Sequence, residues 1–425
     1  MTSPQLGAVE AKPTSRFASP LLPIFLIVVV DVLGFTIILP LLPFYSERLG
    51  ASPTAVGELV SIYAVCQLIS GPILGQLSDR MGRRPLLLVS QAGTLAGFLL
   101  LAFSTHIWML FLARAIDGAT AGNLSIAQAY ISDVTKPEQR ARSFALIGMA
   151  FGFGFLVGPA VSGYLAHYGY TTPIFAAAAL SFTTILCTFF LLPRREPIHE
   201  HNEAAGDPGP GGRRLSLISW GQYRRYFRDP DLARLLAQWL LFSFSFTTFI
   251  SGFALFAERR YTWNGHAVGV REVGYLFAYN GLLGIIMQGG VVGRMVKWWG
   301  ERRVVRIGFA TALAFYPAVG FTSTIGQLLW VSGLCSLFGA GLRPALTSLI
   351  TQKAGKREQG VIIGLTQSLM SIGQIAAPII AGLMIDANDR LHDPRYLTLW
   401  AVWGGVLAGA ALFFEPRTRD ARAAF

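Results

Sequence analysis

Charged residues are scarce in this chain. Only 14% of its 425 residues are Asp, Glu, Lys or Arg, whereas 53% are hydrophobic, and this composition excludes a set of ordinary soluble domains. Cysteine is also scarce, and Cys66, Cys187 and Cys335 lie far apart without metal-ligand spacing. The sequence therefore predicts neither a disulfide framework nor a metal site, and it indicates a membrane protein.

Long apolar runs are what the chain has instead. An apolar helix needs about 20 residues to cross the roughly 30 Å hydrocarbon core of a bilayer. Runs of this length begin near residues 21, 55, 86, 108, 141, 171, 232, 272, 304, 325, 359 and 396. They lack the short alternating pattern of barrel strands, so we expect an all-α membrane protein with twelve transmembrane helices. The first run carries Asp31 and no small-residue cleavage site, so we expect it to remain as a helix.

The formal net charge of +12 is distributed unevenly along the chain. With a cytoplasmic amino terminus, 27 of the 35 Lys and Arg residues fall on the cytoplasmic side of the predicted helices. Two lie inside helices, Arg114 and Arg343, and six lie on the other side: Arg48, Arg259, Arg260, Arg271, Arg390 and Arg395. The positive-inside rule accounts for this bias without nucleic acid as a partner. We expect a multi-pass protein of the cell (inner or plasma) membrane with both termini in the cytoplasm.

A polar segment divides the apolar runs into two sets of six. Residues 193–230 are rich in charge, Pro and Gly, and they predict a cytoplasmic linker between bundles at 21–192 and 231–415, with cytoplasmic tails at 1–20 and 416–425. The two bundles repeat each other at an offset near 219. Gly75, Gly82 and Arg84 match Gly293, Gly300 and Arg302, and Gly158-Pro159 with Gly163 matches Ala377-Pro378 with Gly382. Two like-oriented six-helix halves are an arrangement known from transporters.

The stretch "GQLSDRMGRRP" at residues 75–85 concentrates charge between the second and third apolar runs. It resembles the signature loop of the major facilitator superfamily, G-x-L-a-D-r-x-G-r-r, and this resemblance implies the major facilitator fold. We expect Gly75 to allow close helix approach, Gly82 to form a turn with positive φ, and Asp79 to face a positive group such as a helix N-terminus of the other half. The loop is interpreted as a cytoplasmic latch, or else as a topology anchor only. Its residues are Gly75, Asp79, Arg80, Gly82, Arg83 and Arg84, with Asp133 as an acid within reach.

Glycines also dominate the fifth apolar run. "IGMAFGFGFLVGPAVSGYLA" is similar to the antiporter motif of drug exporters in this superfamily, G-x-x-x-G-P-x-x-G-G, with Ser162 in place of one glycine. Small residues at this spacing flatten one helix face for close packing, and proline adds a bend. Ordinary helix packing is the alternative interpretation. The residues concerned are Gly148, Gly152, Gly154, Gly158, Pro159 and Gly163.

Three ionisable residues lie within the predicted helices of the first half. Asp31 lies ten residues into the first run, about 15 Å at the helical rise, where an ionised acid costs roughly 2.5 to 3.5 kcal/mol. Arg114 and Asp117 are three residues apart and can pair, and they resemble the family's fourth-helix motif, whose arginine is implicated in proton coupling. We expect Asp31, Arg114 and Asp117 to couple transport to protons. The alternatives are a polar interhelical contact for Asp31 and a structural ion pair for Arg114 and Asp117.

A set of polar and aromatic residues near the middle of the predicted helices is expected to line a substrate cavity between the halves. Its members are Phe35, Tyr63, Gln67, Asn123, Phe246, Asn280, Gln288 and Arg343. Arg343 has two interpretations. It contacts an anionic part of the substrate, or it extends toward the cytoplasm as a snorkelling side chain.

The resemblance covers nearly the whole chain and is greatest to the twelve-helix drug/proton antiporters, particularly the tetracycline exporters. Those exporters carry an acid in helix 3 and a histidine in helix 8, where this chain has Gly97 and Gly284, so tetracycline is not the predicted substrate. We predict a monomeric, proton-coupled exporter of amphipathic organic compounds that works by alternating access and needs no cofactor besides the proton. A proton symporter for a metabolite or sugar, and a non-transporting receptor or scaffold, are alternatives. No phosphate-binding loop or nucleophile motif indicates an enzyme.

Overall fold

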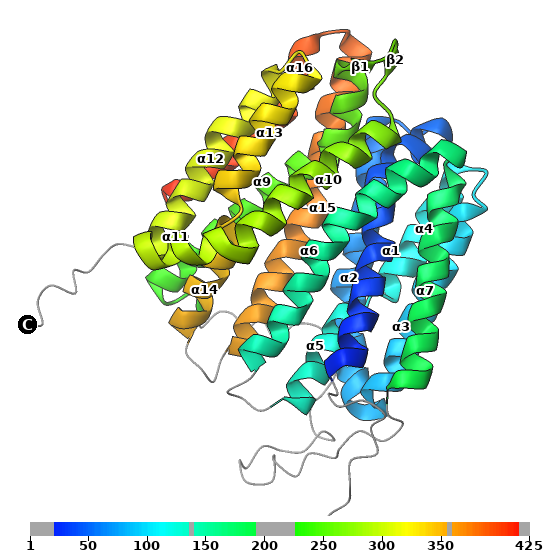
Figure 1. The fold of residues 1–425 in the computed structure, drawn as a ribbon, viewed down its shortest axis with the longest axis vertical. Helices are drawn as coiled ribbons and strands as arrows, with labels where there is room; N and C mark the ends of the chain where they lie inside the picture. Colours follow the sequence, from blue (N-terminus) through cyan, green and yellow to red (C-terminus); the bar gives the residue numbers. More distant parts are fainter. Residues whose placement is uncertain (1–20, 136–139, 193–225, 355–358, 416–425) are drawn as a thin grey trace, which may run out of the picture.

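The computed structural model describes residues 21–135, 140–192, 226–354 and 359–415. Almost all of this part is helical. The strands within it are the short pair β1 (Thr262–Trp263) and β2 (His266–Ala267), which form a hairpin at one end of the bundle (Figure 1). We call this the hairpin end, and we call the opposite end, where Gly82 joins two helices, the Gly82 end.

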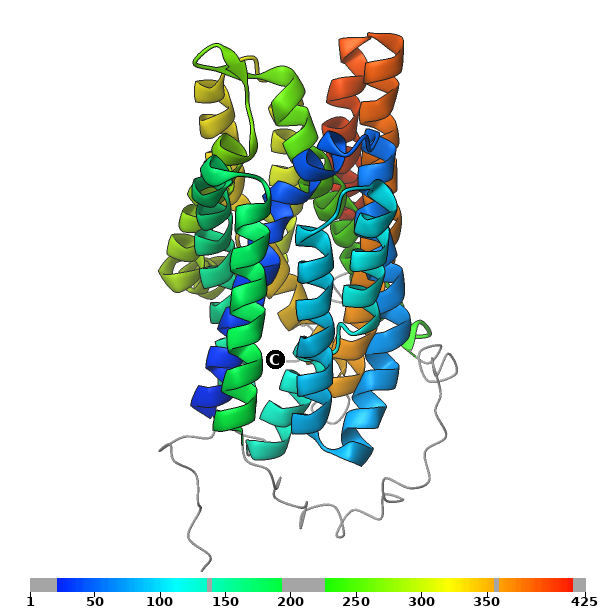
Figure 2. The same cartoon turned by 90° about the vertical axis from the view of Figure 1, so that its right-hand side faces the viewer.

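The first half consists of helices that run alternately between these two ends (Figure 2). They are α1 (Leu21–Arg48), α2 (Pro53–Met81), α3 (Arg83–Ala102), α4 (Ile107–Ala119), α5 (Asn123–Val134), α6 (Arg140–Leu165) and α7 (Thr171–Leu191), with a short 3-10 turn, η2 (Ala166–Tyr168), after α6.

The second half repeats this pattern. Its helices are α9 (Pro230–Arg260), α10 (Val270–Ile286), α11 (Val292–Trp299), α12 (Glu301–Phe321), α13 (Ile325–Gly339), α14 (Leu342–Ala354), α15 (Gln359–Leu391) and α16 (Pro394–Leu412). A π-helical segment, η4 (Met287–Val291), joins α10 to α11.

The helices are long and apolar enough to cross a membrane. Ten helical segments of the described part have the length and hydropathy of a membrane span. The pair α4 and α5 occupies the place of the fourth predicted helix, and α16, with 19 residues, occupies that of the twelfth. Each of the predicted runs begins within three residues of a helix start in the structure. Apolar runs locate the helices in this way because a span needs about 20 consecutive apolar residues to cross the hydrocarbon core.

Two of the twelve predicted helices are interrupted near their middle, which the apolar runs did not predict. The fourth span breaks at Thr120–Gly122, between α4 and α5, and the tenth breaks at Ala340–Gly341, between α13 and α14. At the second break Pro344 has no N–H to donate to the carbonyl of Ala340, so one bond of the regular hydrogen-bond ladder is missing there.

Glycine turns at the Gly82 end confirm the sequence repeat. Gly82 joins α2 to α3 with φ +94°, and Gly300 joins α11 to α12 with φ +76°. Both values lie in the left-handed region that glycine adopts without steric cost, as expected for Gly82. The two halves therefore use the same turn at equivalent positions.

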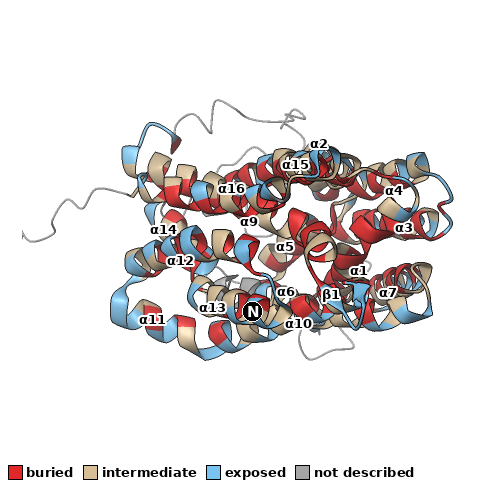
Figure 3. Ribbon diagram, turned by 90° about the horizontal axis from the view of Figure 1, so that it is seen from above, coloured by how far each residue is buried: buried red, intermediate tan, exposed pale blue. Residues whose placement is uncertain are grey.

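The halves contact each other through two pairs of helices, α2 with α15 and α6 with α10, which lie on opposite sides of the bundle (Figure 3). The contacts are close and pseudo-symmetric. Gly57 leaves no room for a β-carbon against the backbone of Pro378, and Gly274 leaves none against Pro159. Gly382 packs in the same way on Pro53, and Gly163 packs on Arg271. All these contacts lie toward the hairpin end.

Toward the Gly82 end the same helix faces separate. Val65 follows Ser61 by one turn on the face of α2 that meets α15, yet its side chain is 38% exposed. No atom lies within 4 Å of a β-carbon built at Gly148 of α6 or at Gly364 of α15, which lie on the faces that pack against the other half farther along. The halves therefore enclose a crevice that is closed at the hairpin end and open at the Gly82 end.

Candidate functional site

Asp31 of α1 is held by the start of α5. The amide Nδ2 of Asn123 donates a hydrogen bond of 2.7 Å to Oδ1 of Asp31. Asn123 is the first residue after the break in the fourth span, so the break places its side chain against α1 at mid-depth. Asp31 itself is half-buried.

Arg114 and Asp117 of α4 form the ion pair predicted from their spacing. Nη1 of Arg114 lies 2.9 Å from Oδ2 of Asp117, and both residues are 6% exposed. Thr94 of α3 also hydrogen-bonds the Asp117 carboxylate. The Arg114 guanidinium lies over the ring of Tyr63 at 4.2 Å from its centroid, and the Tyr63 hydroxyl accepts a hydrogen bond from Gln67. Residues from α2 and α3 thus converge on this ion pair of α4.

The charges of this cluster do not balance. Asp31 lies close enough to Asp117 for their charges to interact, while Arg114 is the cation that the structure pairs with Asp117 rather than with Asp31. With both acids ionised, the three residues carry one uncompensated negative charge. Arg114 Nε and Asn123 Oδ1 are buried and have no hydrogen-bond partner within the described part of the chain. The cluster can therefore take up one proton or face one cation.

Gly97 of α3 lies directly against Asp117. A β-carbon at Gly97 would lie 3.0 Å from Cβ of Asp117, so α3 approaches the acid as closely as its lack of a side chain allows. The exporter resemblance places an acid on the third helix at this position. In this chain the carboxylate enters the same region from α4 instead. Gly284, which stands at the position of the exporters' histidine, has no atom within 4 Å of a β-carbon.

The loop at the Gly82 end is tied to its own half. Arg83 forms an ion pair with Asp79 and a second one, at 2.9 Å, with Asp133 of α5. Arg84 donates a hydrogen bond of 2.6 Å to the carbonyl of Phe189 in α7. Arg80 is exposed, and a β-carbon at Gly75 would meet no atom within 4 Å. The close approach expected at Gly75 and the contact of Asp79 with the other half are absent here, because the halves are apart at this end.

The glycines of α6 face two different neighbours. Gly154 and Gly158 pack on Val32 and Thr36 of α1, within the same half. The other half is contacted instead by Gly163, Pro159 and, more loosely, Gly152, whose nearest neighbour is Ile285 at 3.7 Å. Gly148 is open. Gly158 therefore lies at a close helix contact, as its spacing predicts, but that contact is with α1 of the same half.

A charge cluster at the hairpin end connects the two halves, and the sequence did not predict it. Nη2 of Arg259, at the end of α9, lies 2.6 Å from Oε1 of Glu47, at the end of α1, and 2.7 Å from Oδ2 of Asp389 in α15. Thr54 of α2 donates a second cross-half hydrogen bond, of 3.0 Å, to Asp386 of α15. In the sequence these residues are separated by hundreds of positions and show no spacing signal.

The remaining predicted cavity residues divide between packing and exposure. Asn280 is bound to α13 through the Ser336 hydroxyl at 2.8 Å, and Phe246 stacks on Phe242. Phe35 is half-buried, whereas Gln288, in the π-helical segment, is exposed. Arg343 is exposed at the start of α14.

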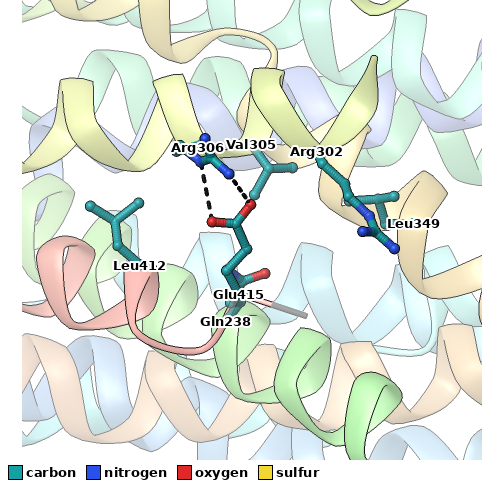
Figure 4. Close-up of a pocket in the computed structure, with 7 residues that line it drawn as sticks. All are labelled: Gln238, Arg302, Val305, Arg306, Leu349, Leu412 and Glu415. Atoms are coloured by element: carbon teal, nitrogen blue, oxygen red, sulfur yellow. Dashed lines mark hydrogen bonds and ion pairs between the residues drawn. The ribbon is translucent and has the colours of Figure 1, made fainter. Parts of the chain in front are cut away.

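A small pocket lined by residues of the second half lies elsewhere (Figure 4). Arg306 and Glu415 form an ion pair across it at 2.6 Å, and its volume of about 10 Å³ has room for about one water molecule. An adjoining groove of about 1000 Å³ is lined by residues of the second half alone, among them Trp298, Arg303 and Lys353. Neither contains a residue predicted to bind substrate.

The fold and the charge cluster together define a class of protein. Two pseudo-symmetric membrane bundles, closed against each other at one end and carrying ionisable residues at mid-depth, are the architecture of a secondary transporter. The sequence matches the family model of the Major Facilitator Superfamily over residues 24–378 and 289–425. The chain belongs to this superfamily, and it is a transporter rather than an enzyme.

Individual relatives agree with this assignment. The chain is 32% identical to the tetracycline resistance protein, class D, of Salmonella ordonez, over 92% of this chain and 96% of that protein. It is 24% identical to multidrug resistance protein 2 of Bacillus subtilis, over 92% and 94% of the two chains. The crystal structure of a bacterial homologue of the lysosomal transporter Spinster, in an inward-facing and unoccupied conformation, shares the fold with a TM-score of 0.73 at 17% identity, covering 93% and 95% of the chains.

Proposed function

We propose that this protein exports amphipathic organic compounds from the cytoplasm in exchange for protons. Its two halves would rock against each other around the crevice, so that the crevice opens to one side of the membrane at a time. The relatives named for tetracycline and multidrug resistance support export of foreign organic molecules. Gly97 and Gly284 give no support for tetracycline itself as the substrate.

The single observation that carries the proposal is the unbalanced charge at mid-depth. Asp31, Arg114 and Asp117 supply two acids and one cation within a low-dielectric region, where an uncompensated charge is costly. A proton neutralises the cluster when the crevice is empty, and a cationic group of a substrate neutralises it when the substrate is bound. Because the two compete for one negative charge, binding of one favours release of the other.

The orientation follows from the distribution of basic residues. We place both termini and the Gly82 end in the cytoplasm, because most Lys and Arg residues lie on that side. The conformation would then be inward-open, which is the state that receives a cytoplasmic substrate. The protein would act as a monomer in the cell membrane, and the proton would serve as its coupling ion without any other cofactor.

The proposal is tested with purified protein in proteoliposomes. Cells that lack their own pumps are first challenged with a panel of toxic organic compounds, and the compounds against which the protein protects become substrates for reconstitution. Wild-type protein should move such a compound against its gradient when a pH gradient is imposed. Accumulation with the opposite dependence on the pH gradient would favour the symporter instead.

The proton role of Asp31 is tested in the same vesicles. Asp31→Asn keeps the hydrogen bond with Asn123 possible but removes the titratable group, so pH-driven accumulation should be lost while downhill exchange of substrate persists. Glu58→Gln, which changes an exposed acid of α2, should behave as wild type. Normal uphill transport by Asp31→Asn would show that this residue is only a polar contact.

A further inference from the structure

Arg343 lies at mid-depth in the second half, at the counterpart of Asn123. Arg343 is eleven residues from the end of α14 at Ala354, and Asn123 is eleven residues from the end of α5 at Val134. Both follow the break in their span, and both lie about 17 Å from the Gly82 end at the helical rise. Asp31, ten residues into α1, lies about 15 Å from that end, so these side chains share one level of the bundle.

The two halves differ in what these positions meet. In the first half Asn123 holds the Asp31 carboxylate of α1. The corresponding helix of the second half, α9, has no acid between Asp231 and Glu258, near its two ends. The repeat therefore places a cation where the first half has an amide, but it places no acid opposite that cation.

Arg343 has no carboxylate partner within the described part of the chain. None of the ion pairs there involves Arg343. No charged side chain of the described part lies close enough to interact with it electrostatically. Arg343 is exposed although it lies at mid-depth in the bundle, whereas its neighbours Leu342 and Ala345 are buried. This combination is typical of a side chain that lines a crevice rather than of one that faces lipid.

The packing of α14 agrees with this placement. Leu342 packs on Gly308 of α12, and Ala345 and Leu346 are buried, so one face of α14 is covered by its own half. Arg343 and Pro344 are exposed on the opposite face. Gly341 packs near Val292, directly after the π-helical segment, whose Gly289 and Gly290 have no atom within 4 Å of a β-carbon. The π-helical backbone is therefore open at these glycines, and π-helical segments are frequent at functional sites.

We infer that Arg343 binds an anionic group of the substrate, and that the preferred substrates are zwitterionic amphiphiles. The planar guanidinium matches a carboxylate in bidentate geometry, and no ion pair within the described chain occupies it. The cationic group of such a substrate faces Asp31 and Asp117 in the first half. This inference rests on the proposed export function and specifies the chemical class of its substrate.

The arrangement also explains why the charges lie in different halves. A substrate that carries both charges contacts both halves at once, so its binding energy depends on how the halves are arranged. Its cation replaces the proton at the acids, which antiport requires, while its anion binds without drawing a proton to them. A purely anionic substrate would favour protonation of the nearby acids, and this would give symport instead.

Three xanthene dyes test the inference directly. Rhodamine 110 carries a carboxylate and a cation, rhodamine 123 is its methyl ester and carries the cation alone, and fluorescein carries only negative charge. Binding to purified protein in nanodiscs is measured by fluorescence anisotropy. Wild-type protein should bind rhodamine 110 more tightly than either of the other dyes. Equal or weaker binding of rhodamine 110 than of its ester would overturn the inference.

Variants separate recognition from folding. Arg343→Gln should weaken rhodamine 110 binding about tenfold or more, as expected for loss of a charge-assisted contact, and should leave rhodamine 123 binding within about twofold. Arg343→Lys keeps the charge without the bidentate geometry and should be intermediate. Arg303→Gln, an exposed arginine of α12, serves as the matched control.

Other outcomes of these experiments would contradict the inference or the proposed function. Equal weakening of both rhodamines by Arg343→Gln, or full rescue by Arg343→Lys, would assign Arg343 to structure or snorkelling. Export of rhodamine 123 that depends on the pH gradient, together with an unaffected Arg343→Gln variant, would refute the zwitterion inference and leave the proposed function standing. Absence of any gradient-driven transport would instead count against the proposed function.

Discussion

The ion pair between Arg259 and Glu47 should hold the hairpin end closed. Of the contacts of Arg259, the one with Glu47 joins the two halves, whereas the one with Asp389 joins α9 to α15 within the second half. The side chains of Arg259 and Glu47 are 19% and 18% exposed, so the pair is largely shielded from water. Opening of the hairpin end must break this contact together with the bond between Thr54 and Asp386.

The size of the effect follows from the charge of the contact. A hydrogen bond between charged groups contributes roughly 1.5 to 3 kcal/mol, and partial exposure places this pair in the lower part of that range. Glu47→Gln should therefore raise the population open at the hairpin end about tenfold relative to wild type. Asp389→Asn leaves the contact between the halves in place and should raise it less than about threefold.

Double electron–electron resonance spectroscopy, which measures the distance between two spin labels, provides the assay. Spin labels are attached to cysteines at Thr105 in the first half and His266 in the second, both exposed near the hairpin end, after Cys66, Cys187 and Cys335 are replaced. The fraction of molecules with the longer distance is compared among wild type, Glu47→Gln and Asp389→Asn. Indistinguishable distance distributions for wild type and Glu47→Gln would refute the reasoning, as would an equal shift in both variants.

Two further predictions concern other parts of the transport cycle. If Asp79 helps to close the Gly82 end in the opposite state, Asp79→Asn should raise the population of the inward-open state about tenfold. Cysteine labelling from the cytoplasmic side would detect this change, and unchanged accessibility would leave the loop as a topology anchor. Gly163→Leu should force α6 away from α10 and increase cysteine labelling from the hairpin end. Gly158→Leu should instead lower thermal stability, because the larger side chain displaces Thr36 within one half. The reverse assignment of the two effects would contradict the packing.

Local features were predictable because local physics determines them. The length of each apolar run set the helices, since a bilayer requires about 20 apolar residues for a span. The spacing of Arg114 and Asp117 predicted their ion pair, because residues three apart lie on one helical face, and the structure confirms it at 2.9 Å. Gly82 was predicted to have positive φ, and it adopts +94°. The family resemblance extended these local signals to the fold as a whole.

The partners of the functional residues were not predictable in the same way. The sequence predicted a proton-coupling role or a polar interhelical contact for Asp31, but it did not identify the hydrogen-bond partner, which is Asn123, 92 residues away. The glycines of α6 predicted close helix packing, but they did not identify Thr36 of α1 as the neighbour of Gly158. The glycine pattern of α6 is compatible with either neighbour, because a flat helix face does not specify which helix will cover it.

What the sequence by itself determined about this protein is its membrane class, the positions of its helices and the identity of the buried charges. These depend on transfer free energies and on spacing along one helix, which are properties of short segments. Only the tertiary structure decided that Arg259 meets Glu47, 212 residues away, that Arg343 has no carboxylate partner among the described residues, and that the crevice opens at the Gly82 end. These features depend on how one half docks against the other. That docking is a sum of many weak contacts between distant residues, and no single stretch of the chain records it.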